Sequence, residues 1–88
     1  MTKALAVELA PKIRVNVVCP GPVATPMMEA EMDAYPDPVA ARKESFERVP
    51  LKRWATAEEV ARAILFLAAD APYATGASLA LDGGTTAI

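Results

Sequence analysis

The chain has 88 residues, 53% of them hydrophobic, and a formal net charge of −2. This size allows one small domain or a part of a larger one, and the composition is too apolar for a disordered chain. No basic excess indicates a nucleic-acid partner, and the longest apolar run, around Ala63 to Ala69, is far shorter than the ~20 residues that span a bilayer.

The first part of the chain predicts a helix followed by a short strand. Thr2 to Ala10 are expected to be helical, because Leu5 and Leu9 lie four residues apart and alanine fills much of the remainder. Pro11 ends this helix, since the residue before a proline disfavours the helical region. The β-branched residues Ile13, Val15, Val17 and Val18 then predict a short strand. Its end is apolar on both faces, which is typical of a sheet covered by helices.

The stretch from Pro20 to Pro38 is rich in proline and has no strong hydrophobic period. It allows a weak helix from Met27 to Asp33, which the proline-containing stretch that follows interrupts. A second, more polar helix is expected from Val39 to Arg48, and Pro50 ends it.

The clearest local signal is the capping box of Thr56 and Glu59. The Thr56 hydroxyl can accept a bond from the Glu59 N–H while the Glu59 carboxylate accepts one from the Thr56 N–H. An apolar stripe at helical spacing follows, made by Val60, Ile64, Leu67 and Ala68. Asp70-Ala71-Pro72 is expected to end this helix, and Ser78 to Leu81 to form the last strand.

The element order is helix, strand, irregular insertion with small helices, helix, strand. It predicts an α/β fold in which a crossover joins two parallel strands. Two parallel strands with few helices make a poor independent fold, because too few elements cover strands that are apolar on both faces.

The Pro20-Gly21 turn at the end of the first strand is the main candidate for a functional site. One interpretation is an ordinary loop, which the Pro-Gly pair marks in general. The other is a ligand site, because open α/β sheets bind ligands at the carboxyl ends of their strands.

The residue inventory excludes several kinds of site. The chain has no histidine, which excludes a Ser-His-Asp triad, a Cys-His pair and zinc sites with histidine ligands. The single Cys19 is expected to be a small buried side chain rather than a reactive thiol. A lone cysteine, and Lys3 and Glu8 where a signal peptide would be apolar, favour a cytoplasmic protein. No metal site is predicted.

Three stretches, in order and with ordinary spacing, resemble the carboxyl-terminal third of the short-chain dehydrogenase/reductase family. Thr2 to Ala10 resembles the second half of the family's catalytic helix, and Asn16 to Thr25 resembles the strand and turn that follow it. Glu58 to Ala68, then Thr75-Gly76, then Leu81 to Gly84 resemble its final helix and strand. The resemblance implies the carboxyl-terminal portion of a Rossmann-type doubly wound parallel sheet, with 1–88 as a partial domain and 26–55 as a substrate lid.

The resemblance also implies a cofactor, NAD or NADP, for the complete enzyme, with one wall of the nicotinamide site in this chain; the chain by itself is expected to carry no cofactor. Pro20 and Gly21 would shape the wall against the ring. The backbone of Val23 would hydrogen-bond the carboxamide. The Thr25 hydroxyl would reach the carboxamide or the pyrophosphate.

The lid would contribute an apolar pocket for a carbonyl or alcohol substrate. By resemblance, Met27, Met28 and Tyr35 would line that pocket. Trp54 is expected to be a packing residue at the base of the lid, since a large ring contributes mainly burial. The resemblance further implies a homo-oligomer that pairs through residues 56–84.

Two parts of the family pattern are absent from the chain. No glycine-rich turn opens a helix with the spacing that seats a pyrophosphate. The family's proton-transferring pair is a tyrosine with a lysine four residues later, but Val39 follows Tyr35 at that distance and Ala77 follows Tyr73. No catalytic residue is therefore predicted in this chain.

Three hypotheses follow. The first is a carboxyl-terminal segment of an NAD(P)-dependent dehydrogenase/reductase that is inactive by itself. The second is a non-enzymatic interaction module that pairs through its last helix and strand. The third is plain instability, because the strand edge from Val15 to Val18 invites aggregation.

Overall fold

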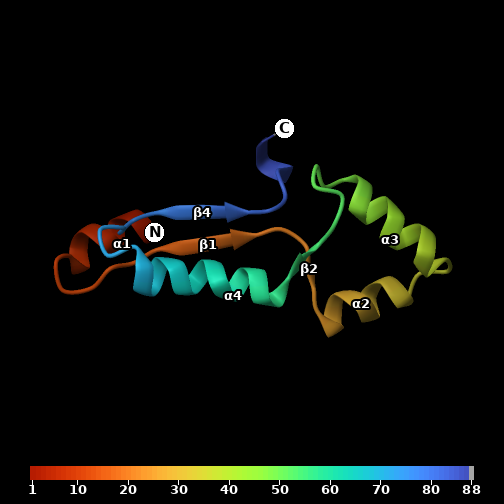
Figure 1. The fold of residues 1–88 in the computed structure, drawn as a ribbon, viewed down its shortest axis with the longest axis horizontal. Coiled ribbons are helices and arrows are strands. Elements are labelled where there is room, and N and C mark those ends of the chain that lie inside the picture. Colours follow the sequence, from red (N-terminus) through yellow and green to blue (C-terminus); the bar gives the residue numbers. More distant parts are fainter. Residues whose placement is uncertain (88) are drawn as a thin grey trace.

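The computed structural model describes residues 1–87, and two regions are visible in it (Figure 1). One contains α1, β1, β4 and α4, and the other contains α2 and α3, with β2 at the junction. In chain order the elements are α1 (Thr2–Leu9), β1 (Val17–Pro20), β2 (Val23–Ala24), α2 (Pro26–Asp33), α3 (Pro38–Glu47), β3 (Ala55–Thr56), α4 (Ala57–Leu65), the π-helical turn η1 (Phe66–Asp70), β4 (Ser78–Leu81) and the 3₁₀ turn η2 (Thr85–Ala87).

The strands β1 and β4 pair in parallel, as the sequence predicts. The register places Val17 opposite Ser78 and Pro20 opposite Leu81. The bounds of β4 are those expected, and α2 and α3 lie within a residue or two of the predicted helices. The capping box is also confirmed, because the Glu59 N–H donates to the Thr56 hydroxyl at 3.1 Å and the Thr56 N–H donates to the Glu59 carboxylate at 2.9 Å.

The first strand begins later than predicted, at Val17 rather than near Ile13. The Ile13 N–H donates to the Leu9 carbonyl at 3.0 Å, so this residue still belongs to the turn that leaves α1. The residues before Ser78, which would have to pair with an earlier start of β1, form a loop. This loop contacts the residues before Val17 partly through side chains: the Val15 N–H donates to the Thr75 hydroxyl at 3.2 Å. The prediction failed because β-branched residues do not by themselves supply a paired strand.

Arg14 binds main-chain carbonyls at and just beyond the carboxyl end of α4 and η1, the helical segment that leads to β4. Its Nη1 donates to the carbonyls of Leu67, Ala71 and Ala74 at 2.8, 3.1 and 3.0 Å, and its Nη2 donates to the Ala68 carbonyl at 2.7 Å. Carbonyls at a helix end lack partners within the helix and carry a partial negative charge. One guanidinium therefore ties the segment before β1 to the whole turn between η1 and β4.

A second parallel pair, β2 with β3, was not predicted. Val23 lies opposite Ala55, and Ala24 lies opposite Thr56. The Ala55 N–H also donates to the Pro22 carbonyl at 3.0 Å. The pair brings together the two ends of the segment that carries α2 and α3.

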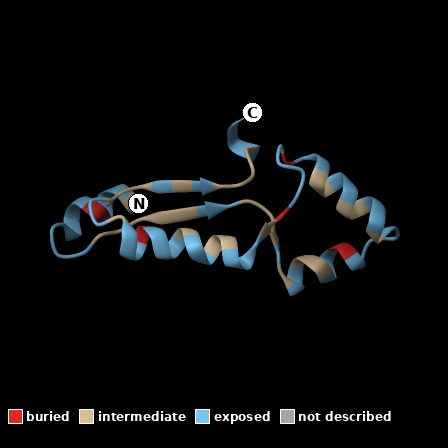
Figure 2. Cartoon of the chain, in the orientation of Figure 1, coloured by how far each residue is buried: buried red, intermediate tan, exposed pale blue. Residues whose placement is uncertain are grey.

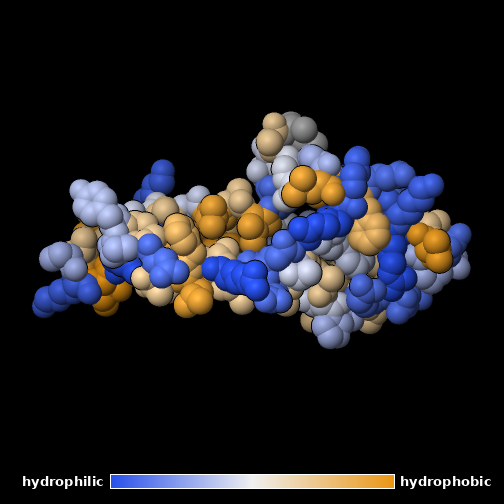
Figure 3. Space-filling model, viewed as in Figure 1, coloured by the Kyte–Doolittle hydropathy of each residue, from blue (hydrophilic) through white to orange (hydrophobic). Residues whose placement is uncertain are grey.

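The described residues form an elongated body with a small core. Its extents are 52 × 27 × 22 Å and its radius of gyration is 16.1 Å, whereas a compact domain of this length would have about 12 Å. Few side chains are buried (Figure 2); the buried apolar residues are Ala6, Met32, Val49, Trp54 and Leu67. Figure 3 shows apolar surface along the β1, β4 and α4 region, while the α2–α3 region is more hydrophilic.

Cys19 is exposed, so the prediction that it is buried is wrong. Its register partner in β4, Ala80, is exposed as well. The helix that packs on β1 is α4, and with only two strands in the sheet Cys19 lies on surface that this helix does not cover.

Among residues 1–87, no helix is both long and apolar enough to cross a membrane.

Replacing Arg14 by methionine keeps the side-chain stem but removes all four bonds to the helix-end carbonyls. We expect Arg14→Met to lower the free energy of unfolding by roughly 2 kcal/mol, because charge-assisted bonds to carbonyls are lost. Arg48→Met is the matched control, since Arg48 is exposed and forms an i,i+4 pair with Glu44 along α3. Its cost should stay below about 0.5 kcal/mol. Urea denaturation of the two variants measures the difference, and equal losses would contradict the role assigned to Arg14.

Candidate functional site

The end of β1 approaches the end of β4 closely at Gly21. The Gly21 N–H donates to the Leu81 carbonyl at 3.0 Å, and a Cβ built on Gly21 would lie 3.0 Å from the Asp82 Cα. A side chain here would push the two strand ends apart. The glycine of the Pro20-Gly21 turn is thus required by the packing of the sheet, independently of any ligand.

The pairing of β2 with β3 decides the direction of the Val23 backbone. The Pro22 carbonyl points at β3, because it accepts the Ala55 N–H. The Pro22–Val23 peptide is trans, and in a trans peptide the carbonyl and the following N–H point in opposite directions. The Val23 N–H therefore points away from β3, at the carboxyl end of the main sheet.

Thr25 lies two residues further on and caps α2. Its Oγ1 accepts the Met28 N–H at 3.2 Å, and Pro26 occupies the first helical position, where no N–H is needed. The hydroxyl hydrogen of Thr25 remains a donor after the capping bond is made. The connection from β2 to α2 thus offers a backbone N–H and a hydroxyl within three residues of each other.

The two helices of the predicted lid are held together by Arg42. Its Nη2 lies 2.6 Å from Glu29 Oε2 and 2.7 Å from Asp33 Oδ1, so one guanidinium on α3 binds two carboxylates on α2. These bonds, first that with Asp33 and then that with Glu29, raise the pKa of Arg42. Glu29 and Asp33 of α2 therefore form an ion-pair face, and within residues 1–87 no cluster of His, Cys, Asp or Glu could hold a metal.

Trp54 is a packing residue, as predicted. Its side chain is 5% exposed, its ring meets the Phe46 ring edge-on with 5.0 Å between centroids, and its Nε1 donates to Ser45 Oγ at 2.8 Å. This contact fastens α3 to the segment that leads into β3.

The residues predicted to line a substrate pocket are not gathered together in the described structure. Met27 is 81% exposed, Met28 is half-buried, and Tyr35 is 51% exposed. A hollow of about 540 Å³ between α2 and α3 includes Tyr35 but neither of those methionines. Met32, the buried residue of α2, was not identified from the sequence. The substrate role of Met27, Met28 and Tyr35 stays a prediction.

A hollow of about 550 Å³ lies at the carboxyl ends of β1 and β4. It is lined by Pro22 rather than by Val23 or Thr25, and its other lining residues come from residues 49–59 and 80–87. Val49 approaches Gly83 here: Gly83 has a φ of +64°, and a Cβ on it would lie 2.5 Å from Val49 Cγ1. The Asp82 carboxylate is occupied locally, because it accepts bonds from Thr86 and from the Gly84 N–H.

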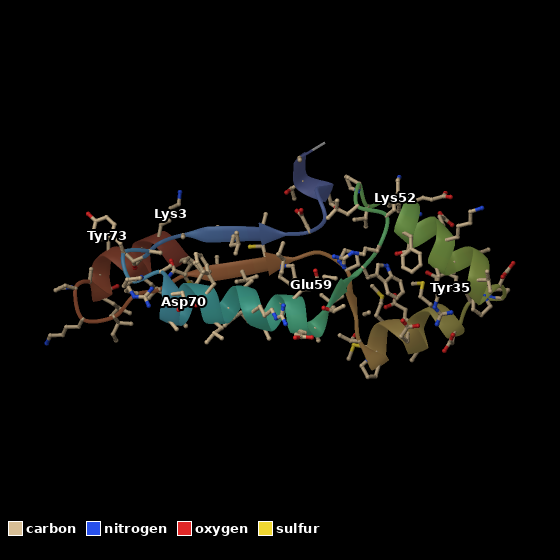
Figure 4. All side chains as sticks on the ribbon, viewed as in Figure 1. Lys3, Tyr35, Lys52, Glu59, Asp70 and Tyr73 are labelled. Atoms are coloured by element: carbon tan, nitrogen blue, oxygen red, sulfur yellow. The ribbon has the colours of Figure 1, made fainter. Side chains whose placement is uncertain are left out.

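The ion pair of Arg53 and Glu59 lies beside this hollow, where the lid segment returns to α4 (Figure 4 labels Glu59). The guanidinium binds both carboxylate oxygens, at 2.7 and 2.9 Å. Arg53, followed by the Thr56 N–H, lowers the pKa of Glu59 to about 2. The sequence identified Glu59 as a capping residue. It did not identify Arg53 as the ion-pair partner of Glu59, since the capping motif contains no position for that arginine.

The donors fit one end of a nicotinamide cofactor. A carboxamide oxygen needs an N–H or O–H donor, and Val23 and Thr25 supply one of each at the carboxyl ends of the strands, where open α/β sheets bind ligands. The two tyrosines lie far apart: Figure 4 places Tyr35 in the α2–α3 region and Tyr73 at the opposite end of the molecule. The arrangement thus offers two donors suited to a carboxamide, while the two tyrosines are not brought together.

Comparison with known proteins identifies the family. The family model described as "Enoyl-(Acyl carrier protein) reductase" matches residues 1–86. A 3-oxoacyl-[acyl-carrier-protein] reductase FabG from Thermotoga maritima is 48% identical over 86 residues, which are 96% of this chain and 32% of that protein. The chain belongs to the short-chain dehydrogenase/reductase family, and it spans about a third of the length of the curated relatives it matches.

Solved structures give the same assignment. The crystal structure of a short chain dehydrogenase family protein from Francisella tularensis superposes with a TM-score of 0.92 and 38% identity, covering 100% of this chain and 39% of that one. A putative 2-deoxy-D-gluconate 3-dehydrogenase from Agrobacterium tumefaciens, solved with bound NADP, gives a TM-score of 0.83 and 42% identity, covering 99% and 35%. The fold is accordingly a portion of a Rossmann-type sheet, as predicted.

The ion pair of Glu59 makes stability depend on pH. Because the pKa of Glu59 is about 2 in the folded chain and near 4.5 ordinarily, its contribution is fully present above about pH 4.5 and is lost as the pH falls toward 2. We expect Glu59→Gln to flatten the decline of unfolding free energy over this range. Glu31→Gln changes the charge equally on an exposed residue of α2. Urea titrations at several pH values measure this, and a slope unchanged by Glu59→Gln would contradict the assignment.

Proposed function

We propose that this chain is the carboxyl-terminal segment of an NAD(P)-dependent short-chain dehydrogenase/reductase and forms the nicotinamide-side wall of the cofactor site. The complete enzyme would transfer a hydride between nicotinamide and a carbonyl or alcohol substrate. The observation that carries this proposal is the Val23 N–H, which points away from β3 two residues before the Thr25 hydroxyl, at the carboxyl end of a parallel sheet. A relative 42% identical in sequence was solved with NADP.

The cofactor supplies the hydride chemistry when it is bound, and the residues of this chain supply binding and orientation. Val23 would donate its N–H to the carboxamide, and Thr25 would donate its hydroxyl to the carboxamide or the pyrophosphate. Pro20 and Gly21 would form the wall against the ring. The Ala55 bond to the Pro22 carbonyl would keep the Val23 N–H in its direction. A proton donor and a phosphate-binding turn would have to come from residues other than these.

The chain by itself should therefore bind the nicotinamide end of the cofactor weakly and have no dehydrogenase activity. We expect nicotinamide mononucleotide to shift the amide resonances of Val23 and Thr25 in NMR titrations, and Thr25→Ala to weaken that response more than Thr25→Ser, which keeps the hydroxyl. Mixing the chain with NADPH and a carbonyl substrate should give no oxidation of NADPH. Turnover by the purified chain would overturn the assignment of inactivity, and unshifted Val23 and Thr25 resonances would overturn the assignment of the site.

A second candidate function is an interaction module, and the exposed apolar side chains of α4 and η1 favour it. Ile64, Leu65 and Phe66 are 53%, 60% and 52% exposed, although apolar residues at adjacent positions of a helix are ordinarily covered on at least one side. Pairing of these surfaces between two copies, or with a relative, would bury them. The proposed pairing region is residues 56–84.

This second function predicts concentration-dependent association that a charge at Phe66 abolishes. We expect Phe66→Glu to sediment as a monomer at concentrations where the unmodified chain forms dimers or larger species. Val39→Glu is the control, because Val39 is equally apolar and 77% exposed but lies on α3. An unmodified chain that remains a monomer alone and with a full-length relative would count against the module.

A further inference from the structure

The Glu59 carboxylate lies at the point where three parts of the molecule meet. Its Oε1 accepts the Thr56 N–H at 2.9 Å and Arg53 Nη1 at 2.7 Å, and its Oε2 accepts Arg53 Nη2 at 2.9 Å. Thr56 is the last residue of β3, Arg53 lies two residues before the end of the predicted lid segment 26–55, and Glu59 itself is in the first turn of α4. Both oxygens of one side chain are used to hold these parts in place.

Arg53 extends this connection into the core of the lid. Its Nη1 also donates to the Trp54 carbonyl at 3.0 Å, and Trp54 is the buried ring that packs on Phe46 of α3. A bidentate guanidinium–carboxylate pair fixes orientation as well as distance. The ion pair therefore links the buried Trp54 segment to the start of α4, in addition to the capping bonds between Thr56 and Glu59.

β3 depends on such an anchor because it is short. It has two residues, as does its partner β2, so few backbone bonds hold the pair together. One of them is the bond from the Ala55 N–H to the Pro22 carbonyl, which turns the Val23 N–H away from β3. A change in the position of β3 is thus transmitted directly to the direction of that N–H.

We propose that Glu59, together with Arg53, is a positioning residue for the nicotinamide wall: the pair holds β3 in place, and β3 sets the direction of the Val23 N–H. This inference rests on the function proposed above for its ligand, while the coupling between Glu59 and β2 rests on the contacts alone. A glutamine at 59 keeps a capping acceptor for the Thr56 N–H but loses the charged, bidentate pairing with Arg53.

The test compares Glu59→Gln with Glu58→Gln in the full 88-residue chain. Glu58 is the neighbouring residue of the same helix turn, and its substitution changes the charge equally but breaks an exposed pair with Arg62 within α4. The first measurement is amide exchange at Ala55, with the Ile64 amide inside α4 as the reference. We expect Glu59→Gln to speed Ala55 exchange relative to Ile64 by roughly fivefold, and Glu58→Gln to leave that ratio unchanged.

The second measurement is binding of nicotinamide mononucleotide, followed at the Val23 amide. Its dissociation constant should rise by a similar factor in Glu59→Gln and stay unchanged in Glu58→Gln. Arg53→Lys, which keeps the charge but not the bidentate geometry, should change both measurements in the same direction. If Glu59→Gln fails to fold, the two measurements on Arg53→Lys decide whether the ion pair positions β3.

Three results would overturn the inference: an Ala55 amide that is unprotected in the unmodified chain, an exchange ratio that neither Glu59→Gln nor Arg53→Lys changes, or equal effects of Glu58→Gln and Glu59→Gln. If the exchange ratio changes as expected but nicotinamide mononucleotide binds to none of the chains, the positioning of β3 by Glu59 is supported. The proposed cofactor function is the part that fails in that case.

Discussion

The parallel pairing of β1 with β4 is the constraint on which the remaining structure depends. Parallel strands cannot be joined by a tight turn, so the chain must leave the carboxyl end of β1 and return to the amino end of β4. The helix α4 makes that return, and Arg14 binds the carbonyls at its far end, which fixes the turn into β4. The same pairing brings Gly21 against Asp82 at the strand ends, the edge where open α/β sheets bind ligands.

The second parallel pair, β2 with β3, determines which main-chain groups face the carboxyl ends of β1 and β4. The segment between β2 and β3 contains α2 and α3. Arg42 binds α3 to α2, and Trp54 packs the residues before β3 against α3. Because the pairing uses the Pro22 carbonyl, the adjoining Val23 N–H faces the opposite way. The candidate site is thus built largely from main-chain geometry, and its direction depends on how firmly β3 is anchored.

The chain has the geometry of its family without a compact core of its own. It follows a solved family member over its full length with a TM-score of 0.92 while covering 39% of that structure. Its radius of gyration of 16.1 Å exceeds what a compact domain of this size would have, and apolar side chains on α1, α4 and η1 remain exposed. Contact with another polypeptide would remove these exposed apolar side chains from water.

The sequence by itself determined the elements whose signals are local. The capping box of Thr56 and Glu59, the proline at the start of α2, and the last strand are encoded by residues within a few positions of one another. The family and its partial Rossmann fold also followed from the order of short motifs. Only the tertiary structure decided the late start of β1, the exposure of Cys19, the β2–β3 pair and the contacts of Arg14 and Arg53. Most of these depend on a partner that is distant in sequence or on a hydrogen bond to the main chain, and neither leaves a pattern in the order of side chains. The pair of Arg53 with Glu59 is closer in sequence, but its six-residue spacing across the end of β3 matches no helical or strand period.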